Sequence, residues 1–350
     1  MDLLIFLIAL SVLVLVHELG HYFFAVRSGV KVEEFGLGLP PRIISRKIGQ
    51  TVFSLNWLPI GGFCKLYGEE EEGKGKKAFN NKTPWQKFWV VIGGVLMNLL
   101  LAGIIFSGVY LIIGGPKETN RVKILAVVPN SPAAVAGLQE GDWIKAINNE
   151  IIEKPAELID LTEKIKGKKA ELIIEREGME KKVDVEVRVQ PPEGEGAMGV
   201  AISNIEMQKI RWYEFYRGIG YGFEEAYYWG KIIVGGVVRV VSDLFHGETP
   251  KDMAGPIGMY EATSIIKRNQ GILAVIHFFG VVSVNLAVVN ILPFPALDGG
   301  RIIFVLYEMI TKRKPNKELE IAINSIGMWL LLLLIFVVTV GDIKRLVLKQ

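Results

Sequence analysis

The sequence has little of several features that mark common classes of soluble protein. It contains one cysteine, Cys64, which excludes an internal disulfide and a zinc site built from several thiolates. Its formal net charge is only +3, and no basic tract alternates with aromatic residues, so we expect no nucleic-acid partner. Histidine is scarce as well, with four residues in 350. A motif that uses two of them is therefore informative.

Apolar residues are in excess: half of the chain is hydrophobic, although 22% of it is charged. They must be concentrated in blocks, and several blocks exceed the ~18 residues that cross a bilayer. Four blocks predict transmembrane helices, at residues 1–26, 88–114, 271–300 and 321–341. The first has neither the basic start nor the cleavage site of a signal peptide, so we expect a retained helix. A wholly soluble enzyme is excluded.

Positive charges beside the spans predict their orientation. The loop 27–87 contains eleven Lys and Arg residues and the loop 301–320 contains five, whereas the first two residues contain none. Loops rich in Lys and Arg stay in the cytosol. Both loops should therefore be cytosolic, with the region between the second and third spans outside. Basic residues near the C-terminus favour the opposite orientation for the fourth span.

The region between the second and third spans changes character. Residues 120–192 contain strand-like runs of alternating polarity separated by Gly and Pro turns, which predict a small α/β domain. Residues 193–270 are aromatic and apolar but carry several charges. That composition is typical of an amphipathic segment beside the membrane rather than of a span.

The cytosolic loop 27–87 contains a predicted β-hairpin. Residues 42–48 and 51–57 are strand-like, and Gly49-Gln50 between them suits a two-residue turn. The fold class that follows is a polytopic α-helical membrane protein with this hairpin and an inserted α/β domain.

The motif that carries chemistry is His17-Glu18-Leu19-Gly20-His21, in the first span. Residues four apart share one face of a helix, so both imidazoles can reach one Zn²⁺. Glu18 lies about 100° round the helix, where it can reach a water beside the metal without binding the metal. The three groups could instead satisfy one another inside a helix bundle. Ionisable groups in an apolar helix are costly, however, and are usually functional.

A catalytic zinc needs a third protein ligand, and Asp298 is the best-placed candidate. The first and third spans run in the same direction, so His17, His21 and Asp298 fall at a similar depth. Two prolines break the third span just before Asp298, as happens where a membrane helix lines a cavity. An isolated Asp-Gly would ordinarily be a turn, and it is the histidine pair that favours a ligand.

The second span contains Gly93, Gly94 and Asn98, a pattern of small residues followed by a polar one. Small residues let helices approach closely, so plain helix packing explains the glycines. Asn98 and Asn290 are polar groups that would admit water to a site within the membrane, as hydrolysis requires. Asn98 is therefore also a candidate substrate-binding residue.

These motifs together resemble the site-2 protease family, and within it the bacterial RseP-type regulated intramembrane metalloproteases. The resemblance rests on the His-Glu-x-x-His motif, on Gly94-x-x-x-Asn98 and on the run from Asn290 to Gly299 that includes Leu297-Asp298-Gly299. It covers nearly the whole chain. The resemblance implies that His17, His21 and Asp298 bind zinc, with Glu18 as the general base and Asn290 stabilising the tetrahedral intermediate.

The resemblance also implies functions for the other regions. Residues 120–192 are similar to one PDZ domain, which would bind a peptide C-terminus or exclude bulky ectodomains on the outer side of the inner membrane. The hairpin resembles a membrane re-entrant β element whose edge pairs with unwound substrate. That pairing makes Thr51, Val52, Phe53, Ser54 and Leu55 candidate substrate-binding residues. The substrates implied are single-span membrane proteins, such as anti-sigma factors or signal-peptide remnants.

Three other functions compete with this interpretation. A membrane adaptor with a decayed protease core would have no need of Glu18 beside two zinc ligands. A membrane zinc protease of another kind would use a later Glu or His as third ligand, and the later spans contain no Glu. A transporter is disfavoured because no inverted repeat of spans is apparent.

Overall fold

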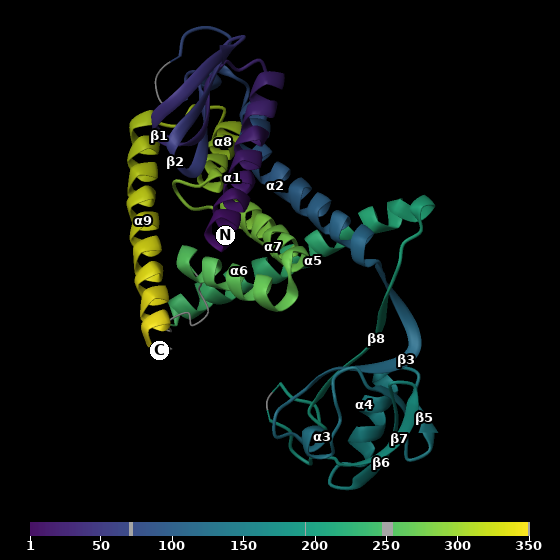
Figure 1. Ribbon diagram of the computed structural model, residues 1–350. Helices are drawn as coiled ribbons and strands as arrows, with labels where there is room; N and C mark the ends of the chain where they lie inside the picture. The colour runs from purple at the N-terminus through teal and green to yellow at the C-terminus, as the bar shows by residue number, and fades with distance from the viewer. Residues whose placement is uncertain (70–72, 193, 247–254, 349–350) are drawn as a thin grey trace. The chain divides into compact units, whose positions relative to one another are not determined.

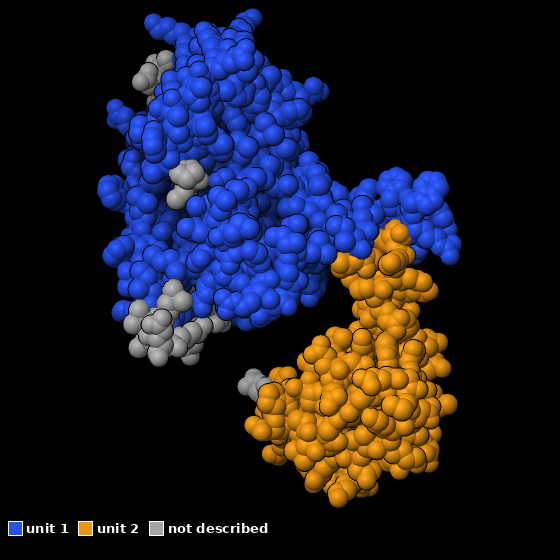
Figure 2. Space-filling model, in the orientation of Figure 1, with its two compact units in different colours: residues 1–112, 211–350 blue, residues 113–210 orange. Residues whose placement is uncertain are grey.

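The computed structural model describes residues 1–69, 73–192, 194–246 and 255–348. The chain divides into two compact units, which Figure 2 shows in different colours. Residues 1–112 and 211–350 form what we call the membrane unit, and residues 113–210 form the inserted unit. The stretch 193–270, predicted as one juxtamembrane segment, contributes to both, and its residues 193 and 247–254 lie outside the described chain.

Four helices of the described residues are long and apolar enough to cross a membrane. They are α1 (Asp2–Arg27), α2 (Pro84–Ile113), α7 (Ile272–Ile291) and α9 (Lys317–Leu348), so the number of candidate spans is the predicted four (Figure 1). Helices α1 and α2 cross where small residues meet, since a Cβ at Gly20 would overlap the carbonyl oxygen of Gly93. Close approach of this kind is what small residues allow in a membrane helix pair.

Residues 271–300, predicted as one span, divide into two helices. Helix α7 ends at Ile291, and α8 (Asp298–Thr311) begins after a turn that contains Pro293 and Pro295. Neither proline can continue the helical hydrogen-bond ladder, so the chain breaks there. Asp298 consequently occupies the first turn of a new helix rather than the interior of a span.

Two further helices cover the membrane unit, α5 (Phe215–Phe245) and α6 (Pro256–Gln270). Helix α5 is amphipathic and is not among the four candidate spans; its apolar face packs through Ala226 against Ala102 of α2 and Val284 of α7. The buried Asp342 of α9 accepts hydrogen bonds from two backbone N–H groups at the start of α6. That contact attaches the last span to the rest of the unit.

The loop between α1 and α2 forms a sheet from β1 (Val32–Ile48) and β2 (Thr51–Leu66), followed by a short 3-10 helix η1 (Phe79–Asn81). Each strand is bent, so that different parts of β1 pair with different parts of β2. Residues 34–37 pair with residues 62–65 on one side and with residues 52–55 on the other, and residues 42–48 pair with residues 51–56.

This pairing corrects the predicted substrate edge. Val52, Phe53, Ser54 and Leu55 each have Cα partners on both sides, and Thr51 pairs with Ile48 and also donates its hydroxyl to the carbonyl oxygen of Val32. A strand paired on both sides has no free N–H or C=O groups to offer another chain. These residues therefore do not form the free edge that was expected, and their contact with substrate stays a prediction. The sheet's edges are residues 42–48 and 62–65.

The inserted unit contains a six-stranded sheet in the order β7-β6-β4-β3-β8, with β5 paired to β4. Its elements are β3 (Gly115–Val127), α3 (Pro132–Val135), β4 (Trp143–Ile147), β5 (Glu150–Ile151), α4 (Pro155–Lys164), β6 (Lys169–Arg176), β7 (Met179–Glu186) and β8 (Val200–Gln208); η2 (Trp212–Glu214) then precedes α5. Strand β8 lies beyond the predicted domain end at residue 192. It belongs here because its apolar side chains join the buried core around Val122 and Leu172.

An ion pair between the buried Asp142 and Arg176 links two parts of this unit. Asp142 accepts hydrogen bonds from the Arg176 guanidinium at 2.7 Å and from the backbone N–H of Gln139 at 2.9 Å. Burial by itself would raise the pKa of the Asp142 carboxyl, but these hydrogen bonds outweigh it and hold the pKa below its ordinary value. The nearby Gly137 and Gly141 have φ of +80° and +96°, a region that favours glycine.

Candidate metal centre

Three side chains converge in the membrane unit although 281 positions separate the first from the last. His17 and His21 lie on one face of α1, and Asp298 lies in the first turn of α8. His17 Nε2 is 3.0 Å from Asp298 Oδ2, His21 Nε2 is 3.3 Å from the same oxygen, and the two Nε2 atoms are 3.2 Å apart. All three side chains are nearly buried, with about a tenth of each exposed.

This triangle fits a tetrahedral zinc ion. Bonds of about 2.0–2.1 Å from zinc to nitrogen or oxygen place neighbouring ligand atoms about 3.3 Å apart. The three observed separations lie within a few tenths of that value. Asp298 Oδ2 is buried without a hydrogen-bond partner, as a metal-binding oxygen would be. Two imidazoles and one carboxylate are also a donor set typical of catalytic zinc.

Helix α2 contacts the Nδ1 atoms of the two imidazoles, on the side opposite the Nε2 atoms. His21 Nδ1 lies 2.9 Å from the carbonyl oxygen of Val90, and His17 Nδ1 lies 3.3 Å from Asn98 Nδ2. Between them, Gly94 leaves open space: a Cβ there would lie 2.6 Å from His17 Cε1 and 2.7 Å from both Nε2 atoms. Only glycine at this position leaves room for a ligand between the imidazoles.

A cavity of about 740 Å³ opens onto these atoms. Glu18, Asn98 and Asn290 line it together with His17, His21 and Asp298, so the structure brings all six of these predicted residues to one place. Within the described chain, Thr51–Leu55 are absent from the lining. Residues 63–66, on the sheet edge beyond them, are present.

The remaining two histidines lie elsewhere, as expected. His277 Nε2 is 2.7 Å from Glu225 Oε1, between α7 and α5. His246 contacts the carbonyl oxygen of Ser242 within its own helix turn. Neither approaches the cavity, so neither competes with Asp298 for the place of third ligand.

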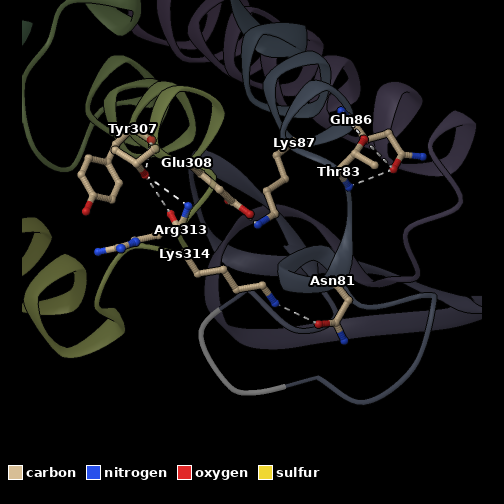
Figure 3. Close-up of polar contacts among 9 residues, drawn as sticks. Asn81, Thr83, Gln86, Lys87, Tyr307, Glu308, Arg313 and Lys314 are labelled. Carbon is tan, nitrogen blue, oxygen red and sulfur yellow. Dashed lines mark hydrogen bonds and ion pairs between the residues drawn. The ribbon is translucent and has the colours of Figure 1, made fainter.

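Two ion pairs between segments far apart in the chain hold α8, and therefore Asp298, in position. Lys87 of α2 and Glu308 of α8 are buried and lie 2.7 Å apart (Figure 3). One turn after Asp298, Arg301 is paired at 2.5 Å with Glu69. Because the partners lie so far apart in the chain, no local sequence pattern predicts either ion pair. The opposite charges of the two partners are the signal that could have suggested each pair.

Replacing Lys87 with methionine should destabilise the membrane unit. The change would leave the Glu308 carboxylate buried without a partner, which costs roughly 3–5 kcal/mol in the free energy of unfolding. Thermal unfolding in detergent would measure the loss. The control is Lys314→Met: Lys314 makes an exposed hydrogen bond to Asn81, whose loss should be worth under about 1 kcal/mol. Equal stability of the two variants would contradict this assignment.

Comparison with known proteins decides the family. The model of peptidase family M50 matches residues 5–334 of the chain. The chain belongs to peptidase family M50. The M50 peptidases are the site-2 proteases, so the resemblance found in the motifs is confirmed.

Relatives within the M50 family match over almost their entire length. A proposed zinc metalloprotease of Clostridium perfringens is 36% identical over 96% of this chain and 97% of its own, and one of Clostridium acetobutylicum is 32% identical over 98% and 97%. The zinc metalloprotease RasP of Geobacillus kaustophilus is 27% identical over 97% of each chain. This M50 member is therefore a zinc-dependent metalloendopeptidase of the membrane.

Two solved PDZ-domain structures match a part of the M50 chain. The PDZ domain of an SdrC-like protein from Listeria monocytogenes covers 24% of it at 21% identity, with a TM-score of 0.22. That of an SdrC-like protein from Listeria innocua covers 25% at 20% identity, with the same TM-score.

Proposed function

We propose that His17, His21 and Asp298 hold the catalytic zinc of an endopeptidase that cuts single-span membrane proteins within their spans. The observation that carries the proposal is the triangle of ligand atoms, which lie 3.0–3.3 Å apart between α1 and α8. When bound, zinc would supply Lewis-acid polarisation of the scissile carbonyl and ease ionisation of water. The remaining chemistry belongs to residues of this chain.

Glu18 is the general base in this mechanism. It lies on α1 between the two histidines and lines the same cavity, so its carboxylate can accept a proton from water and return it to the leaving amine. Asn290, near the end of α7, also lines the cavity. Its amide would donate a hydrogen bond to the oxygen that becomes negative in the tetrahedral intermediate.

Substrate backbone would pair with the sheet edge at residues 62–65. Within the described chain these residues pair only with residues 34–37, and residues 63–66 line the cavity. A Cβ at Gly62 would lie 3.4 Å from Glu18 Cγ, so this edge begins beside the proposed base. A strand added here would be extended, as peptide hydrolysis requires, and its backbone would be satisfied by the edge.

The hairpin 42–58 fits a position within the membrane. Large apolar side chains are exposed along it, among them Ile44, Ile48 and Trp57, each more than half exposed. Apolar surface of this extent is unusual in contact with water. The hairpin would therefore be a re-entrant element of the membrane, in which residues 52–55 are covered by paired strands on both sides.

The only cysteine of the chain tests the edge directly, because Cys64 lies on it and lines the cavity. A Glu18→Gln enzyme in vesicles would be oxidised with single-span substrates that carry one cysteine at successive positions. We expect disulfides to Cys64 at alternate positions, since side chains of a strand alternate with period 2.

Two results would contradict pairing at this edge. Disulfides at every third or fourth position would show a substrate that remains helical. The matched control is Cys64→Ser combined with Phe53→Cys, which moves the thiol to the strand that is paired on both sides. Adducts from that control as abundant as those from Cys64 would place the substrate elsewhere.

The inserted unit would act as a PDZ domain on the outer side of the inner membrane. Its sheet, its helix α4 and the turn around Gly137 and Gly141 support that assignment. Helix α8 and the loop that contains β1 and β2 would lie towards the cytosolic side, from which the hairpin 42–58 re-enters the membrane, because loops 27–87 and 301–320 carry most of the positive charge beside the spans. Anti-sigma factors and signal-peptide remnants are the substrate types that this arrangement suits.

A further inference from the structure

The two proposed histidine ligands must each carry their proton on the nitrogen that faces away from zinc. A neutral imidazole has one N–H and one bare nitrogen, and only the bare nitrogen can bind a metal. His21 meets this condition through its backbone contact. Val90 O is only an acceptor, so His21 Nδ1 donates to it at 2.9 Å and Nε2 is left bare.

His17 contacts the side-chain amide of Asn98, which has a donor end, Nδ2, and an acceptor end, Oδ1. Its Nδ1 lies 3.3 Å from Asn98 Nδ2, which is a donor. In that pairing Nδ1 accepts, so the proton of His17 would sit on Nε2, the atom that faces Asp298 and His21. The same orientation leaves Asn98 Oδ1 buried without any hydrogen-bond partner, on a residue that is 0% exposed.

Rotating the Asn98 carboxamide by 180° exchanges the two ends, so that Oδ1 takes the place of Nδ2 about 3.3 Å from His17 Nδ1 and can accept a hydrogen bond from it. We infer that in the zinc-bound enzyme Asn98 Oδ1 accepts a hydrogen bond from His17 Nδ1–H, which fixes the tautomer that presents Nε2 to the metal. Asn98 is then a positioning residue for the metal ligand rather than a substrate-binding residue. Helix α2 would hold both imidazoles in the ligating tautomer, one through a backbone carbonyl and the other through this side chain. The inference rests on the proposed ligation of zinc by His17.

Three variants of the full-length enzyme in detergent test the inference through zinc affinity, measured by competition with a chromophoric chelator. Asn98→Leu keeps the size of the side chain but has no acceptor, and loss of such a partner weakens metal binding by roughly 10–100-fold. Asn98→Asp keeps an acceptor and should bind zinc within about threefold of wild type or tighter. Ser283→Ala is the packing control.

The control isolates the carboxamide from the packing around it. Ser283 Oγ is buried and donates to the backbone oxygen of Asn98 at 2.8 Å, so its loss disturbs the same helix contact without touching the side chain. Zinc affinity of Ser283→Ala should equal that of wild type. Equal weakening in Ser283→Ala and Asn98→Leu would overturn the inference, as would Asn98→Asp binding more weakly than Asn98→Leu.

A fourth variant separates this inference from the proposed function. His17→Ala must lose most of its zinc affinity if His17 is a ligand; retained affinity would overturn both proposals. If His17→Ala loses zinc but Asn98→Leu binds as tightly as wild type, the metal site stands and the role of Asn98 is refuted. Circular dichroism of each variant confirms that the helices are intact before zinc is measured.

Discussion

Replacing Gly94 with alanine is expected to remove zinc and activity together. The new Cβ would lie 2.6–2.7 Å from atoms of both imidazoles, inside the space where His17 and His21 converge. A carbon cannot remain at that distance, so either the imidazoles move apart or the Cβ occupies the metal position. Loss of the metal's contribution of several kcal/mol should lower the cleavage rate by at least roughly 10³-fold.

Metal analysis by mass spectrometry, together with cleavage of a single-span substrate, checks this expectation. Gly108→Ala is the matched control, because Gly108 lies on the same helix and its Cβ would meet nothing within 4 Å. That variant should keep its zinc and its activity. A Gly94→Ala enzyme with a full equivalent of zinc and normal turnover would show that the metal lies elsewhere.

Replacing Glu18 with glutamine should separate metal binding from catalysis. Glutamine has nearly the same shape but cannot accept a proton, so zinc content should stay at the wild-type value while turnover falls by about 10²–10⁴-fold. The separation of the two readouts distinguishes a general base from a metal ligand. Single-turnover cleavage with excess enzyme measures the chemical step without product release.

Glu33→Gln is the control for this change in charge and shape. Glu33 lines the same cavity but lies on β1, where its carboxylate is paired with Lys31 at 3.9 Å and with Lys65 at 4.0 Å. Turnover of Glu33→Gln should remain within a few-fold of wild type. If Glu18→Gln retains wild-type turnover, the proton acceptor must be another group of the cavity.

The spans and the zinc motif could be predicted because their signals are local. Each span is a continuous apolar block, and the spacing of His17 and His21 is the pitch of a helix. Asp298 becomes the candidate third ligand when depths in the membrane are compared, and the break that Pro293 and Pro295 predict does lie just before Asp298. Family resemblance joined these motifs across nearly the whole chain.

Contacts between distant segments could not be predicted in the same way. Residues 51–57 and 42–48 read as a simple hairpin, and nothing in their alternation indicates that residues 34–37 pair with the other side of residues 52–55. The structure therefore has its free edges at residues 42–48 and 62–65. Lys87 and Glu308 lie 221 positions apart, and their pairing likewise follows from the packing of α2 against α8.

The most direct test of the central claim is the position of the cut. Wild-type enzyme with zinc, reconstituted in vesicles, would be given a single-span protein with a shortened ectodomain, and the new termini would be read by mass spectrometry. Our account predicts that both new termini fall inside the apolar span and that a zinc chelator abolishes them. Termini confined to the soluble flanks of the span, or cleavage unaffected by chelation, would contradict it.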